Sequence, residues 1–429
     1  MARTADVIIV GGGIVGSATA YYLAKGGAKA VLLEKGEIAC EQSSRNWGFV
    51  RQQGRDPFEV PLAIESTRIW QGLETELGTD LEWRQEGGLS IAGSEAGVAA
   101  YERWLDIARQ HQLPTRILNN REIREVMKGA EGSWPGAMYT STDGQAEPTK
   151  AAAAFARAAR SLGAEIETGC AADAIETAGG AVSGVRSARG EIRSATVVCA
   201  AGAWSSQLLR TAGIHMPQLA MRGTVSRTSA VRELTGAGVW GPELAFRQRR
   251  DGTLNIVDGS FFDYDLVPAA LRWGRDFLPL WKIFRKSLRF GVGAPLWHGL
   301  LGSVPGTAWH DQPFRTTRVL NPPPKPERIA NAMSGLRRVF PNLRDVTVAR
   351  SWAGYIDMTP DMIPVLGGVD TPRGLVLATG FSGHGFMLGP VAGRLTSEVI
   401  LRGKPSLDIT AFRLDRFADG TSLGPRPLI

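Results

Sequence analysis

Short apolar runs and glycine-rich turns alternate near the start of the chain. DVIIV, residues 6–10, is apolar at four consecutive positions, which is typical of a strand buried on both faces of a parallel sheet. SATAYYLAKGG, residues 17–27, continues as a helix, and KAVLLEK, residues 29–35, returns as a second apolar strand. The pattern therefore predicts a strand, helix, strand unit in a parallel sheet.

Similar patterns recur further along the chain. EPTKAAAAFARAARSLG predicts an amphipathic helix, AEIETG a strand, and AVSGVRSARGEIR a hairpin. SATVVCAAGAWSSQLL predicts a strand, a glycine turn and a helix, and a last helix follows GFSGHGF. These segments are expected to complete the parallel sheet and its helices.

Two other regions are richer in tryptophan, proline and alternating strand patterns. We therefore expect an α/β chain, α+β as a whole, with a Rossmann-like nucleotide-binding domain and an interleaved mixed-sheet substrate domain. The first is predicted to comprise residues 1–80, 145–220 and 350–429, and the second residues 81–144 and 221–349.

Composition narrows the class of protein. With 429 residues, 43% hydrophobic and 21% charged, the chain can bury a large core. No apolar run approaches the roughly 18 residues that span a bilayer, and no signal peptide precedes DVIIV, so a cytoplasmic protein is expected. Cys40, Cys170 and Cys199 are too few and too scattered for a disulfide framework or a metal site, and they agree with a reducing compartment.

The formal net charge of +7 is compatible with nucleic acid, an anionic membrane surface or acidic small molecules. The arginines are spread along the chain and form no nucleic-acid-binding motif. We therefore expect a small anionic ligand and no nucleic-acid partner.

The first glycine turn has the spacing of a dinucleotide-binding motif, G-x-G-x-x-G, with an acid about 20 residues further on. Gly11 permits the tight turn, Gly13 lets the backbone approach a pyrophosphate, and Gly16 allows close packing of helix and strand. The helix N-terminus favours the phosphates. Glu34 is expected to accept from a ribose hydroxyl, which favours FAD or NAD over NADP.

The second glycine cluster, GFSGHGFMLGP, opens the last helix. Glycine inside regular structure costs about 0.5–1 kcal/mol relative to alanine, so such a cluster usually marks a tight turn or a close backbone approach to a ligand. Taken alone, the cluster fits a helix cap as well as a ligand contact.

Four stretches in this order resemble the D-amino-acid oxidase and sarcosine oxidase family of flavoproteins: the N-terminal glycine motif, VVCAAGAWS, SWAGYIDMTPDMIPVLG and GFSGHGF. The resemblance covers essentially the whole chain and is nearest to the branch of sarcosine oxidase β subunits and related secondary-amine dehydrogenases. It implies a flavoprotein fold of the glutathione-reductase type with FAD as the cofactor.

The resemblance also implies roles for residues around the flavin. The loop Gly383, His384 and Gly385 is expected to approach the pyrimidine end of the flavin through backbone atoms, so that the helix N-terminus stabilises the reduced form. Ser43 and Ser44, in QSSRNWGFVRQQ, are expected to reach the diphosphate or the ribityl chain. The full set of expected cofactor-binding residues is Gly11, Gly13, Ile14, Val15, Gly16, Glu34, Lys35, Ser43, Ser44, Ala172, Ala201, Gly202, Trp204, Gly354, Gly383, His384, Gly385, Phe386 and Met387.

By the same resemblance, Arg51 corresponds to an arginine that binds the substrate carboxylate in sarcosine oxidases. A guanidinium fork matches a carboxylate bidentately. A structural role for Arg51 is the alternative, because Arg45 and Arg55 are near in sequence. Arg247 and Arg249, in the strand-like AFRQRRDG, are the next candidates, and His384 completes the predicted catalytic set.

Five positions depart from the family pattern. Met387 stands where monomeric sarcosine oxidases carry a carboxylate-binding lysine. Gly354 replaces the cysteine that bonds to FAD in those enzymes, so noncovalent FAD is expected. Ile356 and Asp357 stand where glycine oxidases have a carboxylate-binding arginine. Asn255 lies near the position of a lysine that assists oxygen, so the electron acceptor, oxygen or another, stays open.

The segment LRWGRDFLPLWKIFRKSLRF, residues 271–290, is amphipathic and basic, with Trp273, Phe277, Trp281 and Phe284 on or near one face. Such a stripe could rest on a membrane surface, where the protein would pass electrons to a quinone. Alternatively, it could be packed into the core. Packed core is the commoner case, so we expect a helix that covers the substrate domain.

We therefore predict an FAD enzyme that oxidises the carbon–nitrogen bond of a secondary amino acid: an N-substituted glycine such as sarcosine or iminodiacetate, or an opine. The α-hydrogen leaves as hydride to the flavin, and water hydrolyses the resulting imine to an amine and an oxoacid. A neutral amine requires no side-chain base, in line with the absence of a His/Asp or Ser/His constellation.

The alternatives are a flavin electron-transfer or scaffold subunit of a larger dehydrogenase complex, and a membrane-associated D-amino-acid dehydrogenase. A disulfide reductase would need a redox cysteine pair that the sequence lacks. The amine substituent, the oligomeric state and any contact with a membrane surface or partner subunits stay open.

Overall fold

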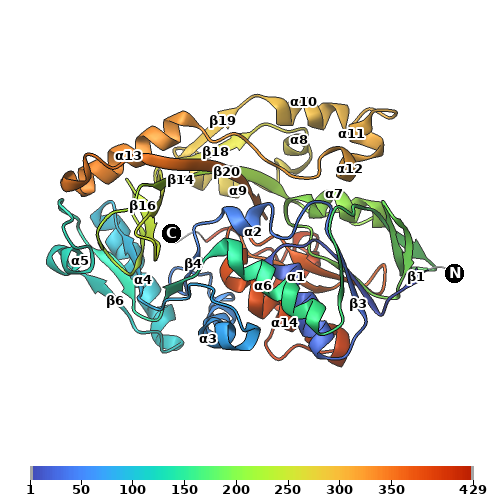
Figure 1. Cartoon of the computed structure of the whole chain (residues 1–429). Helices are drawn as coiled ribbons and strands as arrows, with labels where there is room; N and C mark the ends of the chain where they lie inside the picture. Colours follow the sequence, from blue (N-terminus) through green and yellow to red (C-terminus); the bar gives the residue numbers. More distant parts are fainter. Residues whose placement is uncertain (1–2, 427–429) are drawn as a thin grey trace.

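Two large β-sheets and two small ones organise residues 3–426, the part of the chain that the computed structural model describes (Figure 1). The six-stranded sheet is parallel except for its edge strand β21, which runs antiparallel to β22. Its order is β21 (Val365–Gly368), β22 (Leu375–Thr379), β13 (Val197–Cys199), β2 (Val7–Val10), β3 (Ala30–Leu33) and β9 (Glu165–Glu167).

The central strands of this sheet are apolar at every position because both of their faces are buried. Ile9 and Leu32 face the helices α1 (Ile14–Lys25), α6 (Pro148–Ser161) and α14 (Gly385–Arg402). Ile8 and Val31 face the opposite side, which a four-stranded sheet covers. The continuous apolar runs in the sequence thus predicted the parallel sheet correctly.

The four-stranded sheet contains the predicted hairpin, β11 (Ala181–Ser187) against β12 (Gly190–Arg193). Strands β10 (Ala172–Ala178) and β1 (Arg3–Thr4) complete it on the two edges. A separate two-stranded ladder joins β4 (Phe49–Val50) to β8 (Gly144–Gln145).

The ten-stranded sheet gathers strands from both tryptophan-rich regions. Strand β15 pairs in parallel with β5 and so joins the later region to the earlier one. The sheet's order is β19 (Leu288–Gly291), β18 (Phe262–Asp265), β14 (Leu219–Thr228), β17 (Leu254–Val257), β16 (Ala245–Gln248), β15 (Gly238–Trp240), β5 (Gly88–Ile91), β7 (Ala137–Thr140) and β6 (Thr115–Leu118), and β20 (Val348–Met358) also pairs with β14.

Strand β20 crosses the domain boundary that was expected at residue 350. Its antiparallel ladder with β14 runs from Val348, opposite Thr228, to Met358, opposite Leu219. Residues 350–358 therefore belong to the ten-stranded sheet, and the boundary expected at residue 350 falls inside one of its strands. The division of the chain into two domains otherwise stays a prediction.

Helices pack on the outer faces of both large sheets. Trp70 of α3 (Val60–Leu77) donates from Nε1 to the carbonyl of Met387 in α14, 3.1 Å away, so α3 is held against the last helix. Outside residues 266–325, the other helices are α2 (Gln42–Arg45), α4 (Glu95–Gln110), α5 (Asn120–Val126), α7 (Ser205–Leu209) and α13 (Pro326–Val339).

The segment between β18 and α13 crosses the top of the molecule in Figure 1. It holds α8 (Ala269–Trp273), α9 (Leu278–Phe284), β19, α10 (Ala294–Leu301), α11 (Ala308–Asp311) and α12 (Pro313–Thr316). The single covering helix predicted for residues 271–290 is therefore wrong. Gly274 ends α8, and Pro279 allows a new helix only at its own first turn.

The prediction that this stripe is packed core is correct for only part of it. Phe277 and Leu280 are buried against Met358. Trp281 and Leu271 are exposed, Leu271 to 92%. Within residues 3–426, no helix is both long enough and apolar enough to cross a bilayer.

Candidate active site

A cavity of ≈ 510 Å³ lies at the carboxyl ends of the parallel strands. Val10, Leu33 and Ala200 line it at the ends of β2, β3 and β13. The opposite wall comes from the ten-stranded sheet, through β14 and β20. Ligands of open α/β sheets bind at this edge, where the loops that follow the strands converge.

The turn between β2 and α1 forms one end of the cavity. Gly11 has φ +114°, and a Cβ atom there would lie 2.3 Å from the carbonyl oxygen of Ala200. A Cβ atom at Gly16 would lie 2.0 Å from the carbonyl oxygen of Gly11. Both positions thus admit only glycine, as the motif requires.

The N-terminus of α1 faces the cavity without a side-chain cap at Gly13. The amide of Ile14 donates to Ser43 Oγ, 2.9 Å away. A helix N-terminus offers amide donors and a partial positive charge to a phosphate group. This end of the cavity therefore fits the diphosphate of a dinucleotide.

Glu34 lies just after β3, and its carboxylate holds the surrounding loops. It accepts from the amides of Gly12 and Gly36, each at 2.7 Å. Burial raises the pKa of Glu34, while these two backbone hydrogen bonds act in the opposite direction. The residue lines the cavity, where an acid suits an unphosphorylated ribose.

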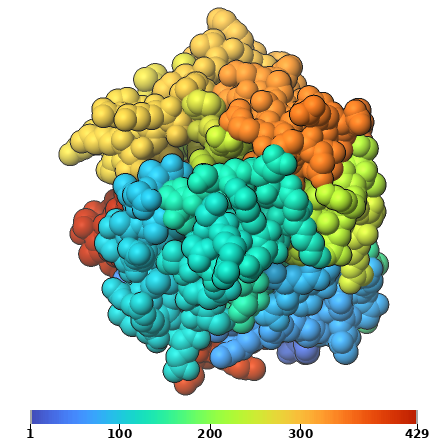
Figure 2. Space-filling model, turned by 90° about the vertical axis from the view of Figure 1, so that its left-hand side faces the viewer, coloured from blue at the N-terminus to red at the C-terminus, as the bar shows by residue number. Residues whose placement is uncertain are grey.

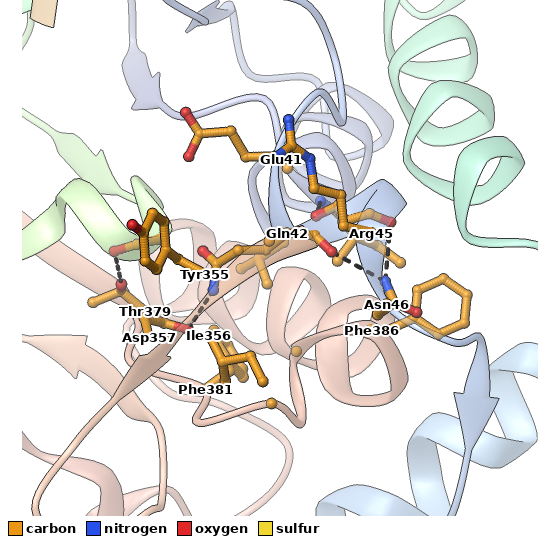
Figure 3. A pocket seen from close by; sticks show the side chains of 18 of the residues that line it. Glu41, Gln42, Arg45, Asn46, Tyr355, Ile356, Asp357, Thr379, Phe381 and Phe386 are labelled. Carbon is orange, nitrogen blue, oxygen red and sulfur yellow. Dashed lines mark hydrogen bonds between the residues drawn. The ribbon is translucent and has the colours of Figure 1, made fainter. Parts of the chain in front are cut away.

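Helix α2 connects the two walls through Gln42 and Asp357, as Figure 3 shows. Gln42 Nε2 donates to Asp357 Oδ1 at 2.8 Å, and Gln42 Oε1 accepts from the amide of Ala203 at 3.1 Å. Asp357 Oδ2 accepts from the amide of Gly380 at 3.0 Å. Burial raises the pKa of Asp357, and the hydrogen bonds from Gln42 and Gly380 lower it. Asp357 thus ties β20, α2 and the second glycine loop together.

Arg45 occupies the space beside Gly354 (Figure 3 shows its side chain). Its Nη1 donates to the carbonyl of Ala353 at 3.0 Å, and its Nη2 donates to the carbonyl of Cys40 at 3.0 Å. A Cβ atom at Gly354 would come within 3.0 Å of Arg45 Cδ. A side chain at position 354 would therefore have to displace a tethered arginine.

Arg51 and Arg55 lie at the other end of the cavity. Arg55 Nε donates to the carbonyl of Arg51 at 3.0 Å, and the Nη1 atoms of both are buried without a hydrogen-bond partner among residues 3–426. Burial, and then the charge of Arg55, lower the pKa of Arg51 to about 9, so it stays charged at neutral pH. The carboxylates of Asp143 and Glu59 act on Arg51 from nearby, but a buried donor without an acceptor is costly, and an anionic ligand at the two Nη1 atoms would relieve that cost.

His384 lies beside these arginines and is oriented by Glu59. Its Nδ1 is 2.8 Å from Oε1 of Glu59, whose side chain is 0% exposed. Burial, and then Arg55, lower the pKa of His384, so the imidazole is neutral at pH 7. With Glu59 Oε1 as the acceptor, His384 donates from Nδ1, and Nε2 is left as a proton acceptor.

Aromatic and thioether side chains form the remaining wall. Trp47 stacks on Trp240 with ring centroids 4.9 Å apart, and the guanidinium carbon of Arg51 lies 5.9 Å from the Trp240 ring. Other apolar side chains that line the cavity include Met221, Phe262, Phe284, Met358 and Met362. The cavity therefore combines a cationic end with an apolar wall.

The structure brings most of the predicted residues to this cavity. Those that line it are Gly11, Gly13, Ile14, Val15, Glu34, Lys35, Ser43, Arg51, Ala172, Ala201, Gly202, Trp204, Gly354, Gly383, His384, Gly385 and Phe386. Gly16, Ser44, Met387, Arg247 and Arg249 are not among the lining residues.

Specific contacts explain the residues that lie elsewhere. Met387 is 1% exposed within the core. Arg247 and Arg249, the next candidates for binding the substrate carboxylate, both pair with Glu147. Arg247 Nη2 and Arg249 Nε lie 2.9 and 3.0 Å from Glu147 Oε2. Arg247 and Arg249 are thus not placed to bind a substrate in this cavity. Asn255 is buried in β17, where it accepts from Arg227.

Sequence reasoning missed Glu59, Trp47, Trp240 and the second cation, Arg55. The four-residue spacing between Arg51 and Arg55 was the only signal for Arg55. Trp240 reaches the cavity from a distant segment, and Glu59 contacts His384 from outside the lining, which no local pattern reveals.

Comparisons with known proteins agree with this site. The family described as FAD dependent oxidoreductase (DAO) matches residues 6–399. The chain is 28% identical to the sarcosine oxidase subunit beta of Rhizobium meliloti (strain 1021) and 25% identical to the glycine oxidase of Bacillus subtilis (strain 168). These alignments cover 97% of this chain in both cases, and 89% and 98% of the two relatives.

Among solved structures, an L-amino acid deaminase from Proteus myxofaciens in complex with anthranilate superposes with a TM-score of 0.89 at 30% identity. The match covers 97% of this chain and 94% of that one. The glycine turn, the uncapped helix and the acid after β3 provide what FAD binding requires. The chain therefore belongs to the DAO family of FAD dependent oxidoreductases.

Proposed function

We propose that this FAD-dependent oxidoreductase oxidises the carbon–nitrogen bond of a secondary amino acid, an N-substituted glycine or an opine. The observation that carries the proposal is the pair of cations, Arg51 and Arg55, at the end of the cofactor cavity: their Nη1 atoms are buried and have no hydrogen-bond partner within residues 3–426. A carboxylate there would compensate both charges and form charge-assisted hydrogen bonds.

The proposed roles follow from the site's chemistry. Arg51, with Arg55 behind it, holds the substrate carboxylate and so orients the α-carbon. The sequence alone predicted no side-chain base, because His384 and Glu59 are far apart in the chain, but their contact makes His384 a candidate base. His384 accepts a proton from the substrate ammonium at Nε2, because only a neutral amine can yield its electron pair. FAD, when bound, supplies the two-electron acceptor for the α-hydrogen. Water then hydrolyses the imine to an amine and an oxoacid.

Of the cofactor's contacts, the α1 N-terminus and Ser43 would hold the diphosphate, and Glu34 the ribose. The loop Gly383–His384–Gly385, which opens α14, would hold the flavin's pyrimidine end. We propose that the cofactor is noncovalent, since Gly354 offers no thiol.

The apolar wall restricts the substituent. Met221, Phe262 and Phe284 line the cavity with apolar surface, which favours an apolar substituent over the second carboxylate of iminodiacetate. This wall also supports a second candidate, a primary amino acid with a large apolar side chain. The similarity to an L-amino acid deaminase crystallised with anthranilate, an aromatic carboxylate, supports that candidate too.

Anaerobic mixing with a substrate panel tests the proposal. The panel contains sarcosine, iminodiacetate, N-methylphenylalanine and phenylalanine, and the corresponding amines without a carboxylate serve as controls. We expect the absorption of oxidised flavin to bleach with N-methylphenylalanine and not with the amines. Bleaching by phenylalanine alone would favour the second candidate. An electron-transfer or scaffold subunit would bleach with none of them.

The molecule that reoxidises the reduced flavin is oxygen in an oxidase and another electron acceptor in a dehydrogenase. Admitting air after anaerobic bleaching separates the two cases, since an oxidase recovers its colour within the turnover time and a dehydrogenase does not.

A further inference from the structure

The exposed apolar side chains of this protein are concentrated in one segment. Of the fifteen large apolar side chains that are exposed among residues 3–426, ten lie between residues 271 and 304. These ten are Leu271, Leu278, Trp281, Ile283, Phe290, Val292, Trp297, Leu300, Leu301 and Val304. Single exposed apolar residues are ordinary, but so many of them within one segment indicate a surface that binds something.

The same segment is strongly basic. Residues 271–304 contain one acid, Asp276, and six basic side chains, all of them exposed. The six are Arg272, Arg275, Lys282, Arg285, Lys286 and Arg289. Lysine and arginine next to exposed tryptophan and leucine are typical of helices that lie in a membrane interface.

The segment has an inner and an outer face. Phe277 and Leu280 pack on Met358, and Phe284 lines the cavity, so the inner face is anchored to the ten-stranded sheet. The outer face carries Trp281 on α9 and Trp297 on α10, exposed to 42% and 62%. In Figure 2 this part of the chain, in yellow and gold, forms the upper edge of the molecule.

Charge decides what covers this outer face. A second copy of the same face would bring two basic surfaces together, which like-charge repulsion opposes. An anionic lipid surface instead attracts the six basic side chains, and its acyl boundary accepts the tryptophan and leucine side chains between them. We propose that residues 271–304 dock this protein on an anionic membrane surface.

Vesicle binding by the FAD-loaded protein tests the proposal. The probes are vesicles of phosphatidylcholine alone and of phosphatidylcholine with phosphatidylglycerol, separated by sedimentation. We expect the protein to sediment with the anionic vesicles, at least tenfold less with the neutral ones, and progressively less as salt screens the charges. Absence of binding to the anionic vesicles would overturn the proposal.

Two double variants separate the apolar contribution to vesicle binding from the electrostatic one. Trp281→Ser with Trp297→Ser should lower vesicle binding at all salt concentrations, and Lys282→Glu with Lys286→Glu should abolish it at low salt. The matched control is Leu162→Ser with Leu401→Ser, which removes two leucines that are 47% and 42% exposed outside the segment.

FAD content and substrate-dependent bleaching should be unchanged in all of these variants, which shows that they are folded. If the leucine control weakens vesicle binding as much as the tryptophan pair does, the segment is not the docking surface. A dimer in solution that only the tryptophan pair disrupts would also overturn the proposal, since a second copy would then cover this face.

Discussion

Oε1 of Glu59 lies 2.8 Å from Nδ1 of His384, although the two residues are 325 positions apart in the sequence. Glu59 precedes α3, and His384 precedes α14, so the contact joins the first turns of two helices that pack together. The pair sets which ring nitrogen carries the hydrogen, and it leaves Nε2 unprotonated next to two cations.

The first prediction concerns the pH dependence of flavin reduction at saturating substrate. Burial lowers the pKa of His384 from its ordinary value of about 6.5, so the rate should rise with pH through a limb below that value and then level off. His384→Asn should remove this limb and slow reduction about a hundredfold or more.

Glu59→Gln is the matched variant, because a glutamine oxygen still accepts from Nδ1. The Glu59 charge raises the pKa of His384, so its loss should move the limb to lower pH without removing it. If the parent and His384→Asn proteins show the same pH profile, His384 is not the proton acceptor.

The second prediction is that Arg51 holds the substrate carboxylate. Truncating one partner of a buried charge pair commonly costs about 2–5 kcal/mol, so Arg51→Met should weaken substrate binding roughly 30- to several thousandfold. FAD content should be unchanged. Arg51→Lys should restore binding only in part, because an ammonium lacks the planar fork.

Arg249→Met is the control for Arg51. Arg249 is paired with Glu147 outside the cavity, so its loss should lower the Tm and leave substrate affinity unchanged. Equal substrate affinity in the parent and the Arg51→Met protein would assign the carboxylate to another group, with Arg55 as the next to test.

The third prediction concerns the first glycine turn. Gly13→Leu should abolish FAD retention, because a Cβ atom there already lies 3.0 Å from Ser43 Oγ and the rest of the side chain would fill the phosphate space. Gly72→Leu is the control, since position 72 lies in α3 with no atom within 4 Å of an added Cβ. The ratio of flavin to protein absorbance after purification measures retention, and a fully loaded Gly13→Leu protein would refute the assignment.

The fourth prediction is that acid precipitation releases the flavin into the supernatant, because Gly354 has no thiol to form a thioether. Gly354→Cys should not restore a covalent link readily, since the new side chain meets Arg45 at about 3 Å and should lower the Tm. A yellow pellet from the parent protein would show that another residue bonds to the cofactor.

Much of the fold and of the cofactor end of the cavity could be predicted because the signals are local. The apolar run before Gly11, the G-x-G-x-x-G spacing and the acid after the second strand all lie within a single strand, helix, strand unit. Each residue there acts through its own backbone conformation or its immediate neighbours, so sequence spacing translates directly into geometry.

The substrate end could be predicted only in part. Arg51 and Arg247 look alike in the sequence. Only packing shows that Arg247 forms an ion pair with Glu147, whereas the buried Nη1 of Arg51 has no hydrogen-bond partner within residues 3–426. The stacking of Trp47 on Trp240 likewise joins two distant segments. Such pairs depend on how the ten-stranded sheet folds over the parallel one, and no periodicity encodes that.

The sequence by itself therefore determined the parallel sheet, the dinucleotide turn and the basic, apolar character of residues 271–290. The tertiary structure alone decided that Glu59 orients His384, that Arg55 joins Arg51, and that Trp281 faces outward while Phe277 faces inward. The physical reason is the distance along the chain over which each effect acts. Hydrophobic periodicity and turn geometry act over a few residues. Burial and charge pairing depend on whichever segment packs opposite, however far away it lies in the chain.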